Sequence, residues 1–120
     1  MTTKNALAGV AVGNLASAIS WYAKLLGRQP DLRPMTDVAE WEFSDGGWIQ
    51  VFKDSGRAGT SSVTLVETDV EARIADLKAK GIAIKQANNT NSVAVAIVVD
   101  PDGNQIVFAQ GRGPAHRAVA

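Results

Sequence analysis

The sequence contains no cysteine and only one histidine, His116. Without cysteine the chain has no disulfide bond, no thiol nucleophile and no thiolate metal site. A single histidine excludes, within one chain, the metal sites that need several imidazole ligands. No apolar run approaches the roughly 20 residues of a membrane-spanning helix, so we expect a cytoplasmic protein.

An excess of charge of either sign is also missing. Twelve Lys and Arg residues balance twelve Asp and Glu residues, and the formal net charge is zero. No net field therefore favours nucleic acid or a membrane surface, and we expect a small uncharged partner instead. The 120 residues, 46% of them hydrophobic, predict a single folded domain.

What the sequence does contain is an internal repeat. At an offset of 55 residues, Asn14 aligns with Asp69, and both are good helix N-cap residues. At an offset of 57, Asp45-Gly46 aligns with Asp102-Gly103, and each pair predicts a hairpin turn. The apolar residues that follow each cap at i, i+4 and i+7 also match: Leu15, Ile19 and Tyr22 in the first half, Val70, Ile74 and Leu77 in the second.

Each half therefore predicts a strand, a helix and about three further strands. The fold class is α+β, with two βαβββ modules at about residues 6–53 and 61–110 inside one domain, 1–110. Two such modules together would form a curved mixed sheet, with the helices on the convex face and the concave face left for a ligand. Residues 111–120 show no periodicity and predict a flexible tail.

Three segments carry a resemblance to a known family. They are Ile19–Arg28, Asp69–Gly81 and the turn Asp100–Ile106, whose sequence is DPDGNQI. The chain resembles the vicinal oxygen chelate superfamily, which includes glyoxalases, bleomycin-resistance proteins and dioxygenases. The resemblance implies paired βαβββ modules, a concave ligand site and a homodimer.

The resemblance also implies four positions at which metal-using members of the family place their ligands. In this sequence they are Leu7, Gln50, Ser62 and Val107. Leu7 and Val107 offer no donor atom, so we expect neither a metal nor another cofactor.

Alternation along the strands predicts which residues line the concave face. A two-residue turn at Asp45-Gly46 would pair Trp41 with Gln50 and Phe43 with Trp48, leaving Glu40 and Glu42 on the solvated convex side. Trp41 and Trp48 would then stack on a ligand, with Gln50, Ser62 and Thr64 as hydrogen-bonding groups. The complete set of candidate ligand-binding residues is Leu7, Trp41, Phe43, Trp48, Gln50, Phe52, Ser62, Thr64, Gln105 and Val107.

The function that fits this lining is metal-independent binding of a hydrophobic, aromatic small molecule, as in antibiotic or drug resistance. No residue is assigned a catalytic role. Two alternatives stay open. One is a lyase, isomerase or dioxygenase of the same superfamily with a displaced metal site. The other is a domain whose cup is closed by its own side chains and serves only subunit association.

Overall fold

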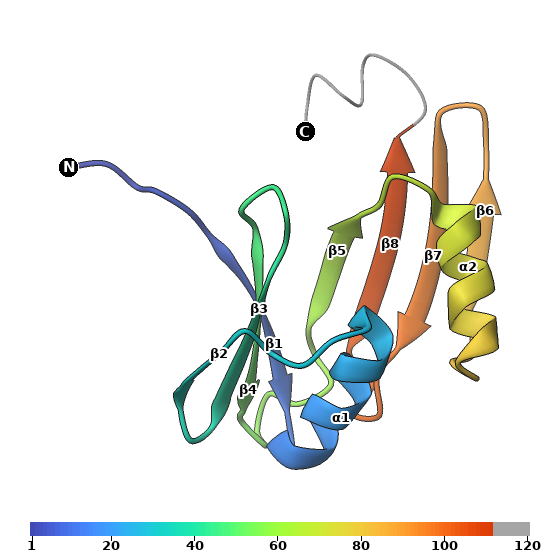
Figure 1. The fold of residues 1–120 in the computed structure, drawn as a ribbon. Helices are drawn as coiled ribbons and strands as arrows, with labels where there is room; N and C mark the ends of the chain where they lie inside the picture. Colours follow the sequence, from blue (N-terminus) through green and yellow to red (C-terminus); the bar gives the residue numbers. More distant parts are fainter. Residues whose placement is uncertain (112–120) are drawn as a thin grey trace. The chain divides into compact units, whose positions relative to one another are not determined.

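A computed structural model describes residues 1–111 of the chain (Figure 1). The predicted tail, 111–120, lies outside the described residues except for its first position, and so does His116. The elements follow the order β1 (Leu7–Val12), α1 (Leu15–Leu26), β2 (Leu32–Met35), β3 (Val38–Glu42), β4 (Trp48–Lys53), β5 (Ser62–Val66), α2 (Val70–Ala79), β6 (Gln86–Asn89), β7 (Val93–Val99) and β8 (Gln105–Gly111). This is the predicted repeat of strand, helix and three strands.

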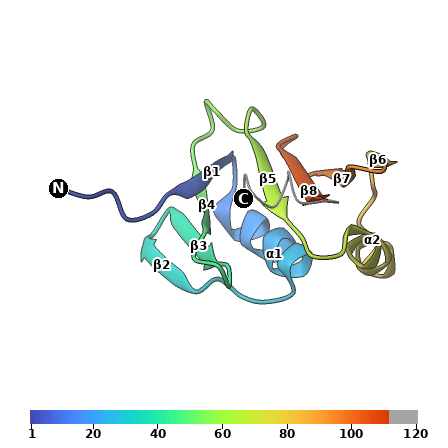
Figure 2. The same ribbon diagram turned by 90° about the horizontal axis from the view of Figure 1, so that it is seen from above.

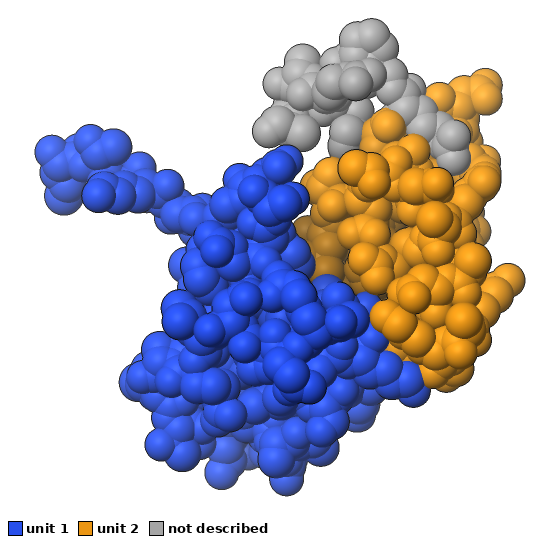
Figure 3. Space-filling view, viewed as in Figure 1, with its two compact units in different colours: residues 1–63, 100–104 blue, residues 64–99, 105–120 orange. Residues whose placement is uncertain are grey.

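The chain divides into two compact units (Figure 3). Of the described residues, unit 1 comprises 1–63 together with Asp100–Asn104, and unit 2 comprises 64–99 and 105–111. Each unit contains one helix and four strands, and the turn of the second hairpin groups with the first unit. In each unit the helix lies on one face of the sheet (Figure 2).

Unit 1 contains a four-stranded mixed sheet with the order β1-β4-β3-β2. β1 runs parallel to β4, whereas β4, β3 and β2 are antiparallel neighbours. Val10 and Val12 of β1 and Ile49 and Val51 of β4 are fully buried, as their alternation predicts. These side chains form the core on the α1 side of the sheet.

The ends of α1 follow from its flanking residues. The Asn14 side chain accepts a 3.0 Å hydrogen bond from the Ser17 backbone N–H. At the other end Gly27 adopts a left-handed conformation, φ 81°, and its N–H donates to the Ala23 carbonyl. Tyr22 and Leu25 point into the core and are fully buried, while Trp21 is half-buried with its ring edge-on to Tyr22.

Unit 2 has the equivalent strand order, β5-β8-β7-β6, and α2 begins at the predicted cap, Asp69. The Asp69 side chain accepts a hydrogen bond from the Ala72 N–H, 3.1 Å away. Val70 and Leu77 of the helix are buried. Buried strand residues complete the core: Leu65, Ala94, Ala96, Val98, Ile106 and Phe108.

The two hairpin turns have the same geometry, which supports the repeat at an offset of 57. In the first, the Phe43 N–H donates to the Gly47 carbonyl, and Gly46 has a φ of 94°. In the second, the Asp100 N–H donates to the Asn104 carbonyl and Gly103 has a φ of 102°. Each loop therefore has three residues and ends on a left-handed glycine.

Neither helix of the described residues is long and apolar enough to cross a membrane.

Candidate functional site

The three-residue turn changes the pairing of β3 with β4 by one position. A two-residue turn would pair Trp41 with Gln50, but the structure pairs Trp41 with Ile49 and Glu40 with Gln50. The predicted hairpin register is therefore wrong. A slip of one residue moves every side chain of a strand to the opposite face. Trp41 and Glu40 of β3 therefore lie on the faces opposite to those predicted.

Trp41 consequently belongs to the core and not to a ligand-binding surface. Its side chain is fully buried, and its ring centroid lies 6.2 Å from that of Tyr22. The indole Nε1–H donates a 2.9 Å hydrogen bond to the Arg28 carbonyl at the end of α1. The burial of Trp41 contradicts its predicted role in stacking on a ligand.

Phe43 is also misplaced by the predicted register. It lies beyond the last residue of β3, opposite Gly47 and not Trp48, and is half-buried. Glu42 takes the position across from Trp48 and is exposed.

Glu40 is the residue that the sequence prediction missed. It is only 8% exposed, although it was expected on the solvated side. Gln50 lies directly across from it, and the Gln50 Nε2 donates a 2.6 Å hydrogen bond to Glu40 Oε2. The sequence left this outcome open, because a three-residue loop that ends on a left-handed glycine, here Gly46, is the other common result of an Asp-Gly pair.

One sheet face of unit 1 therefore combines this polar pair with apolar groups. We name it the Glu40 face: the side of β1, β4 and β3 away from α1 and Trp41. Its larger and polar members are Leu7, Glu40, Glu42, Trp48, Gln50 and Phe52, and the small residues Gly9, Ala11 and Val38 share the same side by register. Trp48, Gln50 and Phe52 are half-buried, and Leu7 is 45% exposed.

Gly9 leaves room beside Gln50 on this face. It is the β1 partner of Gln50, and a Cβ atom there would lie 3.2 Å from Cε1 of Phe52. The Phe52 ring therefore leans over the backbone of β1. The Arg57 guanidinium lies over the same ring, 5.5 Å from its centroid.

The remaining predicted site residues lie on β5 and β8. Ser62 and Thr64 are exposed, and Gln105 and Val107 are half-buried. By alternation, Thr64, Gln105 and Val107 lie on the opposite side of their strands from the buried Leu65, Ile106 and Phe108, and their contact with a ligand stays a prediction.

The residues at the four metal-ligand positions of the resembled family do not fit a divalent ion. Leu7 and Val107 have no donor atom, and Gln50 is already hydrogen-bonded to Glu40. Within residues 1–111, no group of three or more His, Cys, Asp or Glu side chains could hold a metal ion.

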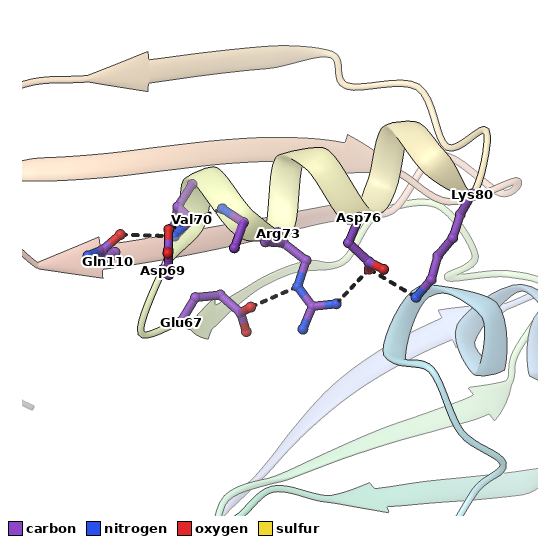
Figure 4. Close-up of polar contacts among 8 residues, drawn as sticks. Glu67, Asp69, Val70, Arg73, Asp76, Lys80 and Gln110 are labelled. Carbon is purple, nitrogen blue, oxygen red and sulfur yellow. Dashed lines mark hydrogen bonds and ion pairs between the residues drawn. The ribbon is translucent and has the colours of Figure 1, made fainter.

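The ion pairs of unit 2 lie along α2 (Figure 4). Arg73 bridges Glu67 and Asp76 at 2.7 and 3.2 Å, and Lys80 contacts Asp76 at 3.0 Å. The hydrogen bond from Lys80 lowers the pKa of Asp76. In unit 1, the hydrogen bond from Arg28 similarly lowers the pKa of Asp31. These charges are compensated locally, unlike that of Glu40.

The chain is similar to a known protein family and to several solved structures. Residues 5–108 match the Glyoxalase/Bleomycin resistance protein/Dioxygenase superfamily. A glyoxalase/bleomycin resistance protein from Catenulispora acidiphila DSM 44928 is 30% identical, with 90% of this chain and 98% of that chain covered and a TM-score of 0.82. No curated protein sequence matches the chain.

Two less similar structures share the fold. TnmS3, an antibiotic-binding protein from Streptomyces sp. CB03234, is 22% identical, with a TM-score of 0.77 over 92% of this chain and 97% of that one. A bleomycin-binding protein complexed with bleomycin is 20% identical, with a TM-score of 0.70 over 91% and 99%. The match over residues 5–108, together with the repeated βαβββ arrangement, shows that the chain belongs to the glyoxalase/bleomycin resistance protein/dioxygenase superfamily.

Proposed function

We propose that the chain binds a hydrophobic, aromatic small molecule on the Glu40 face without the help of a metal ion. The observation that carries the proposal is the pair of half-buried aromatic side chains on β4, Trp48 and Phe52, which flank Gln50 on one side of the sheet. Aromatic surface with a few fixed polar groups is the usual chemistry of a small-molecule site.

The structural relatives support the same class of function. Of the proteins with this fold, TnmS3 is an antibiotic-binding protein and another is a bleomycin-binding protein complexed with bleomycin. Their identity to this chain is low, so they support a ligand-binding use of the fold and not a particular ligand. A resistance role, a homodimer and a cytoplasmic location remain predictions.

The proposal is tested by titrating the protein with a neutral planar probe, 2-naphthamide, and following the backbone amide resonances by NMR. Binding should shift the resonances of β4 around Trp48 and Phe52. The Trp48→Ala variant should bind at least about fivefold more weakly, since an aromatic stacking contact contributes about 1 kcal/mol beyond the area it buries.

Trp21→Ala provides the matched control, because Trp21 is also half-buried but lies on α1. This variant should keep the affinity of the wild type. Shifts confined to other strands, or equal losses of affinity in the two variants, would refute the proposed site.

A further inference from the structure

We infer that the Glu40 carboxylate binds a positively charged N–H group of the ligand, so that the ligand class is an aromatic cation such as an arylamidinium. This inference rests on the proposed function and names its ligand class. It is argued from the hydrogen-bond donors that surround the two most buried carboxylates, Glu40 and Asp100.

The Asp100 carboxylate is fully satisfied by the protein. It is 4% exposed and accepts hydrogen bonds from four donors in unit 1. The donors are the Tyr22 hydroxyl, the backbone N–H groups of Asp102 and Asn104, and the Asn104 side-chain amide. Such a set of donors stabilises a buried negative charge without a cation.

The Glu40 carboxylate is buried to a similar extent but accepts far fewer hydrogen bonds than that of Asp100. Glu40 is 8% exposed, yet among residues 1–111 its carboxylate accepts one side-chain hydrogen bond, from Gln50, and forms no ion pair. The carboxylates that do form ion pairs are more exposed; the side chain of Glu67, the least exposed of them, is 20% accessible. A buried carboxylate with one neutral partner gains more from a cationic donor than a solvated one does.

The hydrogen bond with Gln50 also orients the acceptors. Because Gln50 Nε2 donates to Glu40 Oε2, the second carboxylate oxygen and the Gln50 carbonyl oxygen are left to accept. Two acceptors on side chains that face each other across the strand pair match a planar group with several N–H donors better than a hydroxyl or a carbonyl. Trp48 and Phe52 lie diagonally from Glu40 across the strand pair, about 7–8 Å away, within reach of the aromatic part of such a ligand.

The test compares two probes of the same shape, 2-naphthamidine, which is cationic, and 2-naphthamide, which is neutral. Titrations followed by NMR at physiological ionic strength screen the charges of exposed groups. The wild type should bind the cation at least about tenfold more tightly than the neutral probe, because charge-assisted hydrogen bonds are roughly twice as strong as neutral ones. The side-chain NH₂ resonances of Gln50 should shift with the cation.

Glu40→Gln removes the charge and keeps the shape, and it should reduce the preference to about twofold or less. Glu42→Gln is the matched control: it makes the same change two residues along β3, at an exposed position of the same face. It should keep most of the preference, because the charge that it removes is solvated.

The outcomes separate this inference from the proposed function. Binding of both probes with equal affinity, dependent on Trp48, would overturn the inference and leave the proposed function standing. Absence of binding by either probe would overturn both. A preference for the cation that survives Glu40→Gln, or that Glu42→Gln abolishes equally, would also overturn the inference. If Glu40→Gln does not fold, the Gln50 side-chain shifts in the wild type decide, since an unresponsive Gln50 contradicts the inference.

Discussion

The hydroxyl of Tyr22 on α1 donates a 2.7 Å hydrogen bond to Asp100, which lies 78 residues further along the chain. Asn104, at the other end of the same turn, is fully buried and donates through its side-chain amide to the Ala11 carbonyl of β1. The DPDGN turn therefore owes its place in unit 1 to buried polar contacts. The turn that carries part of the family resemblance therefore has a structural role in unit 1.

The first prediction concerns Tyr22, the only tyrosine of the chain. Burial, and next the hydrogen bond to Asp100, raise the pKa of its hydroxyl well above the ordinary value of about 10. The stability associated with the neutral hydroxyl is present below pH 10 and is lost as the pH rises, because the unfolded chain releases the proton first. The free energy of unfolding should fall by up to about 1.4 kcal/mol per pH unit above pH 10.

Tyr22→Phe should remove this part of the alkaline loss. At neutral pH it should destabilise the protein by about 1–3 kcal/mol, since a buried carboxylate loses a donor. Denaturant unfolding of both proteins between pH 7 and 11 measures the two effects. Tyrosinate absorbance that rises near pH 10 while the wild type is still folded would contradict the prediction.

The second prediction concerns three glycines with different surroundings. Gly59 has a φ of 86°, and a Cβ atom there would lie 2.4 Å from the Asp102 carbonyl oxygen. Gly59→Ala should therefore destabilise the protein by about 2–4 kcal/mol, through overlap in addition to strain. Gly46→Ala adds only the strain of a φ of 94° in open space and should cost about 1–2 kcal/mol.

Gly47→Ala is the control, because a Cβ atom there meets nothing within 4 Å and its φ is not positive. It should change the free energy of unfolding by less than about 0.5 kcal/mol. Thermal and denaturant unfolding of the three variants give the order. A Gly59→Ala variant as stable as Gly47→Ala would show that the 54–60 segment does not lie against Asp102.

The elements that the sequence predicted well are those indicated by more than one sequence feature. The caps Asn14 and Asp69 begin the two helices, and the apolar periodicity gave the buried faces of β1, β4, β5 and β8. The register of β3 had a single signal, the Asp45-Gly46 pair, which is compatible with a loop of two or three residues. Choosing the two-residue loop therefore assigned Trp41 and Glu40 to the wrong faces of the sheet.

Composition could not reveal the chemistry of the Glu40 face either. A net charge of zero suggested an uncharged partner, but it is a sum over 24 charged side chains, most of them solvated. One carboxylate, 8% exposed, changes the local field far more than its share of the total. Its burial depends on the strand register, which was the feature that the sequence left open.

The third prediction concerns the ion pairs along α2. The hydrogen bond from Lys80 is the main cause of the lowered pKa of Asp76, and its removal in Lys80→Met should raise that pKa toward the ordinary value of about 4. A lowered pKa contributes stability that is present above pH 4 and lost as the pH falls through the folded-state value. The variant should therefore lose less stability in acid, by no more than about 0.5 kcal/mol, since the Asp76 side chain is 40% exposed.

Carbon-13 NMR titration of the Asp76 carboxyl group measures the change in pKa. Lys78→Met, two residues earlier on the exposed side of the same helix, is the control and should leave the pKa of Asp76 near that of the wild type. Equal shifts in the two variants would mean that any nearby positive charge, and not the specific contact with Lys80, lowers the pKa of Asp76.

The fourth prediction separates the two tryptophans that the sequence placed on one face. Trp41→Phe should destabilise the protein by about 1–3 kcal/mol, because it leaves a cavity in the core and removes the hydrogen bond to the Arg28 carbonyl. Trp48→Ala should cost less than about 1 kcal/mol, since Trp48 is only half-buried. Binding of 2-naphthamide should show the reverse order, with affinity reduced in Trp48→Ala and retained by folded Trp41→Phe.

Unfolding free energies and NMR titrations of the two variants therefore test the hairpin register in solution. The three-residue turn predicts one variant with a defect in stability and one with a defect in binding. A two-residue turn would place both tryptophans on the Glu40 face, and both variants would then lose affinity with little loss of stability. That result would return Glu40 to the solvated side and remove the basis for a cationic ligand.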